Sequence, residues 1–214
     1  FQQAIDDYSE ALKINANESK AFIGRALAHY HLGHADDALS DYAEAIRLNP
    51  RDARASVGRG LIYFSQADFQ RAWVNFDQAL RINPDDAQAY LGRADSNAKL
   101  GKADDAILDY TAVLRLMPDD VNAYYNRALL HHERGDIDTA LADYEQVSQR
   151  IPPDAALSYN MACLLTQKNQ LEAAFAQLEQ ALTLGGESIA ATAATDPDFA
   201  PLRGDARFAE LVRE

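Results

Sequence analysis

An alanine recurs every 34 residues along the chain, and this period constrains the fold more than any other feature. The column consists of Ala4, Ala38, Ala72, Ala106, Ala140 and Ala174. A mostly aromatic position follows four residues later in each unit, and a proline column keeps the same phase. The prolines are Pro50, Pro84, Pro118 and Pro152. Such a period is typical of a repeat array, in which each unit buries its apolar face against its neighbours.

The unit at 19–52 predicts a helical hairpin. Apolar residues recur at helical spacing from Ala21 to Tyr30. Gly33 ends that helix, because glycine tolerates the left-handed conformation of a helix terminus. A second helix begins near Asp36, whose carboxylate suits a helix N-terminus. Asn49-Pro50 stops it, since proline biases the preceding residue toward an extended conformation.

These columns resemble the tetratricopeptide-repeat family, and in particular its bacterial arrays. The unit at 87–120 carries the pattern as Tyr90, Ala94, Gly101, Ala106, Tyr110 and Pro118. The resemblance implies an all-α, right-handed superhelical solenoid of helix-turn-helix repeats. It further implies a scaffold that binds another protein, without enzymatic activity or a cofactor.

The same phase divides the chain. We expect residues 1–18 to be the second helix of a truncated repeat, and 19–186 to hold five repeats that start at 19, 53, 87, 121 and 155. Residues 187–214 are expected to form capping helices, and their sequence resembles the tail of many bacterial arrays. Because the chain opens at Phe1 inside a helical pattern, we expect it to be part of a longer protein.

The resemblance also implies where a partner binds. In this family the first helix of each hairpin lines a concave groove, whose inward offsets also include Lys20, Arg54 and Gln88 here. Two asparagines stand at an offset that one subclass uses to hold peptide backbone. The partner-binding set is therefore Ile23, Leu27, Tyr30, Val57, Leu61, Phe64, Leu91, Asp95, Tyr125, Asn126, Leu129, Tyr159 and Asn160. Apolar and aromatic anchors suit a peptide or a helix, although single members could instead pack between repeats.

Two charged columns predict ion pairs within the array. The arginines are Arg25, Arg59, Arg93 and Arg127. The acidic column is Asp7, Asp41, Asp109 and Asp143, with Asn75 in the remaining unit. A planar guanidinium suits a partly buried carboxylate, so we expect Arg–Asp pairs between adjacent helices.

The overall charge restricts the class of partner. Asp and Glu outnumber Lys and Arg by 33 to 20, and the formal net charge is −13. Nucleic acid and anionic membrane surfaces are disfavoured, because both attract basic faces. No apolar run is long enough for membrane insertion. The sequence does not distinguish a cytoplasmic from a periplasmic location.

Catalytic and metal sites find little support in the sequence. No two histidines stand at i and i+4 on a predicted helix, and His29 and His131 share an offset that is normally aromatic, so we expect both to be packing residues. Cys163 lies between Ala162 and Leu164 and is expected in the core.

Two other roles remain open beside the scaffold. One is oligomerisation, with a homodimer forming through the apolar face of the first helix, where Ile5, Tyr8 and Leu12 lack a hairpin partner. The other is a regulatory arm of a larger multidomain protein.

Overall fold

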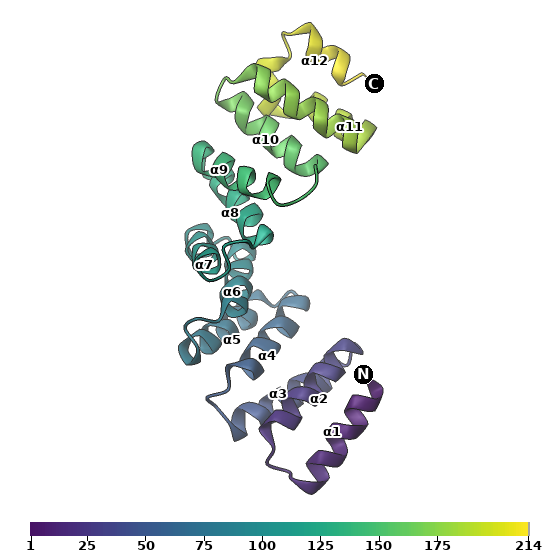
Figure 1. Ribbon diagram of the computed structural model, residues 1–214, viewed down its shortest axis with the longest axis vertical. Helices are drawn as coiled ribbons and strands as arrows, with labels where there is room; N and C mark the ends of the chain where they lie inside the picture. The colour runs from purple at the N-terminus through teal and green to yellow at the C-terminus, as the bar shows by residue number, and fades with distance from the viewer. Residues whose placement is uncertain (214) are drawn as a thin grey trace. The chain divides into compact units, whose positions relative to one another are not determined.

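The computed structural model describes residues 1–213, which form helices joined by short turns and contain no β-strand (Figure 1). The chain divides into two compact units: unit 1 is Phe1–Pro118, and unit 2 begins at Asp119. None of the helices in the described part of the chain is long and apolar enough to cross a membrane.

Unit 1 is built from helical hairpins in chain order. Its helices are α1 (Gln2–Ile14), α2 (Ser19–His31), α3 (Ala35–Leu48), α4 (Ala53–Ser65), α5 (Phe69–Ile82), α6 (Ala87–Lys99) and α7 (Ala103–Leu116). The hairpins are α2–α3, α4–α5 and α6–α7, and each packs against the next, while α1 packs against α2.

Unit 2 contains two more hairpins and the tail. Its elements are α8 (Val121–Glu133), α9 (Ile137–Ser148), α10 (Ala155–Gln167), α11 (Leu171–Thr195), the 3₁₀ helix η1 (Pro197–Leu202) and α12 (Ala206–Leu211). Gly186 interrupts α11 with φ 58° and ψ −146°. The part of α11 before Gly186 completes the last hairpin, and the part after it belongs to the tail.

The turn within each hairpin has one repeated conformation. The second residue after the first helix has a positive φ of 78° at Gly33, 73° at Gly101 and 79° at Gly135. Ala67 and Asn169 adopt the same region with φ of 59° and 58°. An aspartate caps the N-terminus of the first helix in most hairpins. At α6, for example, Asp86 Oδ1 accepts a hydrogen bond from the backbone N–H of Ala89 at 3.0 Å. The sequence columns therefore fix where the helices begin and end.

An aromatic ring packed against glycine joins one hairpin to the next. Phe76 on α5 is fully buried, between Gly60 on α4 and Gly92 on α6. A Cβ added to Gly92 would lie 2.3 Å from Cζ of Phe76, and one added to Gly60 would lie 2.7 Å from its Cε1. Only glycine leaves room for the ring on both sides.

Gly92→Ala is expected to destabilise the protein by about 1–3 kcal/mol through overpacking. Helix propensity alone predicts the opposite sign, a gain of about 1 kcal/mol. The midpoint of urea unfolding followed by circular dichroism decides between them. Gly204→Ala is the control, because nothing lies within 4 Å of a Cβ there. An unchanged or raised midpoint for Gly92→Ala would contradict the packing role of Phe76.

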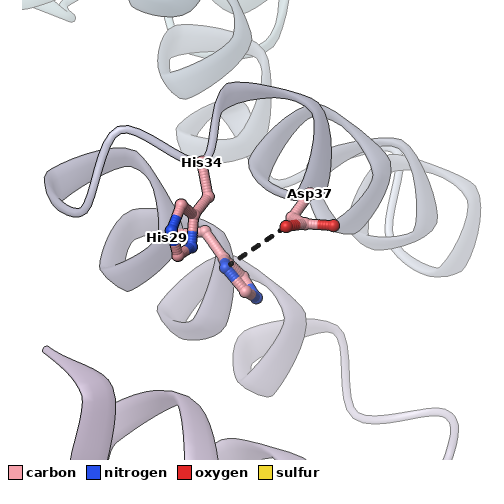
Figure 2. A group of neighbouring side chains, drawn as sticks. All are labelled: His29, His34 and Asp37. Atoms are coloured by element: carbon pink, nitrogen blue, oxygen red, sulfur yellow. Dashed lines mark ion pairs between the residues drawn. The ribbon is translucent and has the colours of Figure 1, made fainter.

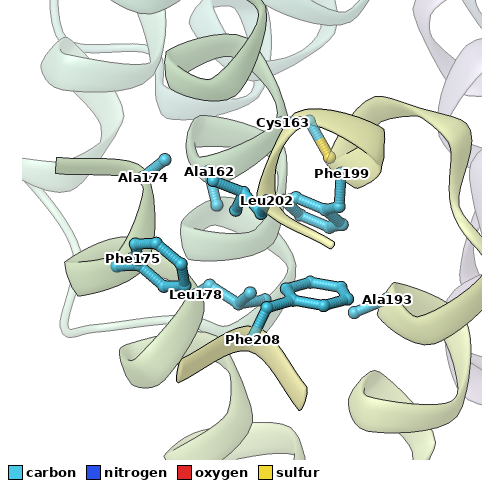
Figure 3. Close-up of a cluster of buried hydrophobic side chains, with 9 residues drawn as sticks. All are labelled: Ala162, Cys163, Ala174, Phe175, Leu178, Ala193, Phe199, Leu202 and Phe208. Carbon is cyan, nitrogen blue, oxygen red and sulfur yellow. The ribbon is translucent and has the colours of Figure 1, made fainter. Parts of the chain in front are cut away.

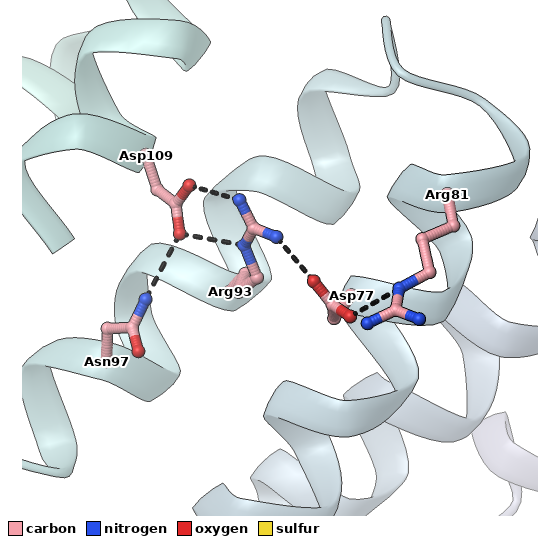
Figure 4. Close-up of polar contacts among 5 residues, drawn as sticks. All are labelled: Asp77, Arg81, Arg93, Asn97 and Asp109. Carbon is pink, nitrogen blue, oxygen red and sulfur yellow. Dashed lines mark hydrogen bonds and ion pairs between the residues drawn. The ribbon is translucent and has the colours of Figure 1, made fainter. Parts of the chain in front are cut away.

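A guanidinium links three helices of unit 1 (Figure 4). Arg93 on α6 donates to both carboxylate oxygens of Asp109 on α7, from Nε at 2.9 Å and from Nη2 at 2.7 Å. Its Nη1 donates to Asp77 on α5 at 2.8 Å, and Asn97 donates to Asp109 at 3.1 Å. The carboxylate of Asp109 is buried, and the hydrogen bond to it raises the pKa of Arg93. The pair joins the helices of one hairpin and also reaches the preceding hairpin.

The predicted Arg–Asp columns are confirmed in three hairpins. Arg25 binds Asp41 and Arg127 binds Asp143, with both Nη2–Oδ1 distances at 2.7 Å, as in the Arg93–Asp109 pair. The α4–α5 hairpin differs, because the amide of Asn75 donates to the carbonyl of Arg71 at 2.8 Å. Within residues 1–213, Arg59 has no ion pair.

Arg93→Met and Arg59→Met form a matched pair of substitutions. Arg93→Met leaves the buried Asp109 carboxylate without its cation and should cost about 3 kcal/mol. Arg59→Met removes no ion pair and should cost less than about 1 kcal/mol. Chemical unfolding of the two variants gives the difference. Equal losses would mean that packing of the arginine stem, and not the charge pair, stabilises the hairpin.

One expectation about α1 is wrong. Ile5 and Leu12 do not form an exposed apolar face, since each is buried, with 9% and 8% of its surface accessible. The reason is that α1 packs on α2. Tyr8, the third residue of that face, lies against Gly24 of α2 and remains 37% exposed.

Candidate functional site

A cleft of about 720 Å³ opens in unit 1 along α2 and α4. Its apolar lining comes from Ile23 and Leu27 on α2 and from Val57 and Leu61 on α4. Within each pair the residues are four apart, so each pair stands on one face of its helix. Leu27 remains 49% exposed.

Glycines bring aromatic rings close to the backbone of the cleft. A Cβ on Gly24 would lie 2.3 Å from Cζ of Tyr8, and one on Gly58 would lie 2.2 Å from Cζ of Tyr42. All four residues line the cleft. Burial raises the pKa of Tyr42 to about 12. The wall of the cleft therefore combines aliphatic groups with neutral phenol.

The rim of the cleft is polar. Lys20, Arg54, Gln88 and Glu18 stand around it. Arg54 is occupied by Asp52, with Nε to Oδ1 at 2.9 Å and Nη2 to Oδ2 at 2.5 Å. Lys20 is exposed and takes part in no ion pair within the described residues. Its ammonium group and the carboxylate of Glu18, which is also exposed, are the rim charges without an ion pair among the described residues.

The structure gathers only part of the sequence-predicted set into this cleft, namely Ile23, Leu27, Val57 and Leu61. Tyr30 instead packs against the core of its own hairpin, and Phe64 meets Phe69 edge to face at 5.3 Å. Leu91 is half-buried on α6 and does not line the cleft. Asp95 accepts a hydrogen bond of 2.5 Å from the hydroxyl of Tyr110.

Sequence reasoning missed the residues that form the wall, Tyr8, Gly24, Tyr42 and Gly58. A signal for them was present. Gly24, Gly58 and Gly92 recur at the 34-residue period, each next to an inward offset.

In unit 2 the predicted residues form a polar and aromatic cluster. Asn160 donates to the hydroxyl of Tyr125 at 3.0 Å, and the ring of Tyr125 meets that of Tyr144 edge to face at 5.5 Å. Leu129 packs against the core beside Tyr144, and Asn126 is half-buried on α8. Tyr125, Leu129 and Asn160 thus pack within the array, which is the alternative that the sequence left open.

The tail covers Tyr159, the remaining member of the set. Its hydroxyl donates to Asp196 Oδ2 at 2.5 Å, and the ring of Phe199 meets it edge to face at 5.4 Å. Phe199 and Leu202 from η1 and Phe208 from α12 share a buried cluster with Cys163 (Figure 3). The inward face of α10 is therefore occupied by the chain's own tail.

Cys163 is confirmed as a core residue. It is buried, and desolvation raises the pKa of its thiol, helped by the nearby charges of Asp196 and Asp198. The three residues offer ligand atoms within 4.8 Å of one another. A raised thiol pKa disfavours the thiolate, which is the form that acts as a nucleophile.

Phe199→Ala should expose this cluster. Truncating a fully buried phenylalanine costs about 3–5 kcal/mol. A thiol reagent should modify native Cys163 slowly and the variant faster, because the tail then opens more often. Phe1→Ala, at a position that is 65% exposed, is the control. Equal modification rates in all three proteins would contradict the covering role of η1.

The family profile described as tetratricopeptide repeat matches residues 23–75 and 98–156. Related profiles match residues 60–101 and 155–184. The chain belongs to the tetratricopeptide repeat family. Its all-helical array of paired helices is typical of the solenoids of this family, and such repeats imply interaction with proteins in a family that is usually non-enzymatic. No curated protein matches the sequence.

Solved bacterial repeat proteins share the fold. YrrB, described as a TPR protein with an unusual peptide-binding site, superposes with a TM-score of 0.80 at 22% identity over 88% of this chain and 98% of its own. PilF of Pseudomonas aeruginosa gives 0.75 at 16% identity over 95% and 89%. A MamA protein gives 0.72 at 17% identity over 84% and 95%. At these identities the likeness concerns the fold alone.

Proposed function

We propose that this protein is a scaffold whose unit 1 cleft binds a peptide or helix of a partner protein. The observation that carries the proposal is the cleft of about 720 Å³ with four aliphatic side chains on two helices. Leu27 is 49% exposed and Ile23 and Leu61 are half-buried, while Val57 is buried. Aliphatic groups gathered in a concavity, with a polar rim, are what a protein-binding groove requires.

The spacing of these groups suits a segment with regularly spaced apolar side chains. Ile23 and Leu27 stand about one helical turn apart on α2, as do Val57 and Leu61 on α4. A helix with apolar residues at i, i+4 and i+7 meets two such stripes, and so does an extended strand through alternate side chains. The peptide-binding site described for YrrB supports this use of the fold.

The rim favours one type of flanking residue. Lys20 is exposed at the edge of the cleft in a protein whose net charge is −13. A carboxylate beside the apolar anchors of the peptide would pair with this ammonium group. We therefore favour a partner segment that is apolar and carries at least one Asp or Glu near its end.

Self-association is a second candidate. Ile14 and Phe1 on and beside α1 are 89% and 65% exposed, and such side chains can pair with a second copy of the chain. Light scattering across a range of concentrations tests it. If the mass stays monomeric up to about 100 times the protein concentration of the binding experiments, no dimer forms under the conditions of those experiments.

A random peptide library displayed on phage tests the cleft directly. Selection on the native protein should enrich peptides with apolar anchors and an acidic flank. Leu27→Asp combined with Leu61→Asp should weaken a selected peptide at least about 10-fold, because buried anchor contacts dominate such affinities. Leu108→Asp is the matched control, since Leu108 is 68% exposed on α7 and does not line the cleft. Peptides that bind the double variant and the native protein equally would refute the cleft assignment.

A further inference from the structure

Two histidines and an aspartate converge at the first complete hairpin turn (Figure 2). His29 lies in the last turn of α2, His34 directly precedes α3, and Asp37 lies in the first turn of α3. Each offers one ligand atom, and these atoms all lie within 4.8 Å of one another. They come from both sides of the Gly33 turn.

His29 shows that this group is incomplete. Its Nδ1 atom is buried and has no hydrogen-bond partner, and the nearest carboxylate oxygen, Oδ2 of Asp37, is 3.9 Å away. A buried nitrogen without a partner costs free energy that a bound ligand would recover. The imidazole is 85% buried by its side-chain surface, since only 15% of it is accessible.

The equivalent turn three repeats later provides an internal comparison. His131 and Asp136 stand 102 residues after His29 and His34, which is three periods of 34. There, His131 Nδ1 has a partner, because Asp136 Oδ2 lies 3.3 Å from it. In the first complete repeat His34 stands at the position of Asp136. The turn therefore holds a second imidazole nitrogen in place of the carboxylate that pairs with His131.

We propose that His29, His34 and Asp37 bind a first-row divalent cation, for which Zn²⁺ is the best match. Two imidazoles and one carboxylate are ligands that zinc accepts, with bonds of about 2 Å. Two ligand atoms of a tetrahedral zinc ion stand about 3.4 Å apart, so atoms that now lie up to 4.8 Å from one another must close by up to about 1.4 Å. His34 and Asp37 are exposed and have room to do so, while His29 is held by the core. Water, or a partner's side chain, would complete the coordination.

The surrounding charges permit a cation here. The N-terminus of α3 disfavours it through the helix dipole, but Asp36 and Asp37 both stand in that first turn. Arg25 lies near Asp37, and its guanidinium is already neutralised by Asp41. A bound ion would join the end of α2 to the start of α3. It would therefore order the hairpin that supplies Ile23 and Leu27 to the cleft.

Isothermal titration of the whole chain with Zn²⁺ tests the site. One saturable site is expected. His34→Ala and Asp37→Asn should each weaken it at least about 10-fold, as the loss of even supporting contacts does at zinc sites. Asp36→Asn makes the same charge change in the same helical turn, so it should leave the affinity within about 2-fold. His31→Ala controls for a neighbouring exposed histidine.

Cobalt gives an independent readout, because its visible spectrum changes when imidazole ligates it. That spectrum should appear in the native protein and in Asp36→Asn and be lost in His34→Ala. All four substitutions are at exposed positions, and unchanged circular dichroism verifies the fold. Absence of saturable binding would overturn the proposal. So would equal weakening by Asp36→Asn and Asp37→Asn, which would indicate attraction by charge alone.

Discussion

The array depends on an aromatic ring that packs against the glycine of the next hairpin. A single hairpin cannot bury both of its faces, so its stability comes from the neighbour. Phe76 fills the space between Gly60 and Gly92, where any larger residue would collide with it. The same contact shapes the cleft. Tyr8 packs on Gly24 and Tyr42 packs on Gly58, so the wall of the cleft consists there of backbone and aromatic ring. Leu27 and Leu61, about one turn further along, line the cleft.

The two units use this glycine column differently. In unit 2 the column holds Asn126 and Asn160, and Asn160 bonds to the hydroxyl of Tyr125. A polar side chain thus stands at the position where unit 1 has only backbone against an aromatic ring. The tail then covers Tyr159 through Asp196 and Phe199. One repeat pattern therefore gives an open cleft in one unit and a closed, internally bonded face in the other.

Features that recur within each repeat could be predicted from the sequence. The turn at Gly33 and the Arg93–Asp109 pair could be predicted, because their residues recur at the same offsets in successive repeats. The burial of Ile5 and the contacts of Tyr159 with Asp196 and Phe199 could not be predicted this way, since each depends on a contact outside the repeated pattern. The histidine group was missed for a geometric reason. A search for ligands at i and i+4 follows one helix, whereas His29 and His34 are five residues apart across a turn.

Departures from a column carry more information than the column itself. Equivalent turns share one backbone conformation, so a changed residue can be compared within the same molecule. In the α4–α5 hairpin Asn75 stands where three other hairpins have an aspartate, so Arg59 lacks a counter-charge within residues 1–213. The hairpin still forms, which means that the ion pair is not required in every hairpin. His34 stands where Asp136 stands three repeats later. Asp136 Oδ2 is the hydrogen-bond partner of His131 Nδ1, and the equivalent Nδ1 of His29 has no such partner in the described part of the chain. Asn75 removes an ion pair and adds no new group, whereas His34 brings a second imidazole nitrogen to the turn. Only the second therefore leaves a group of donors that a cation could join.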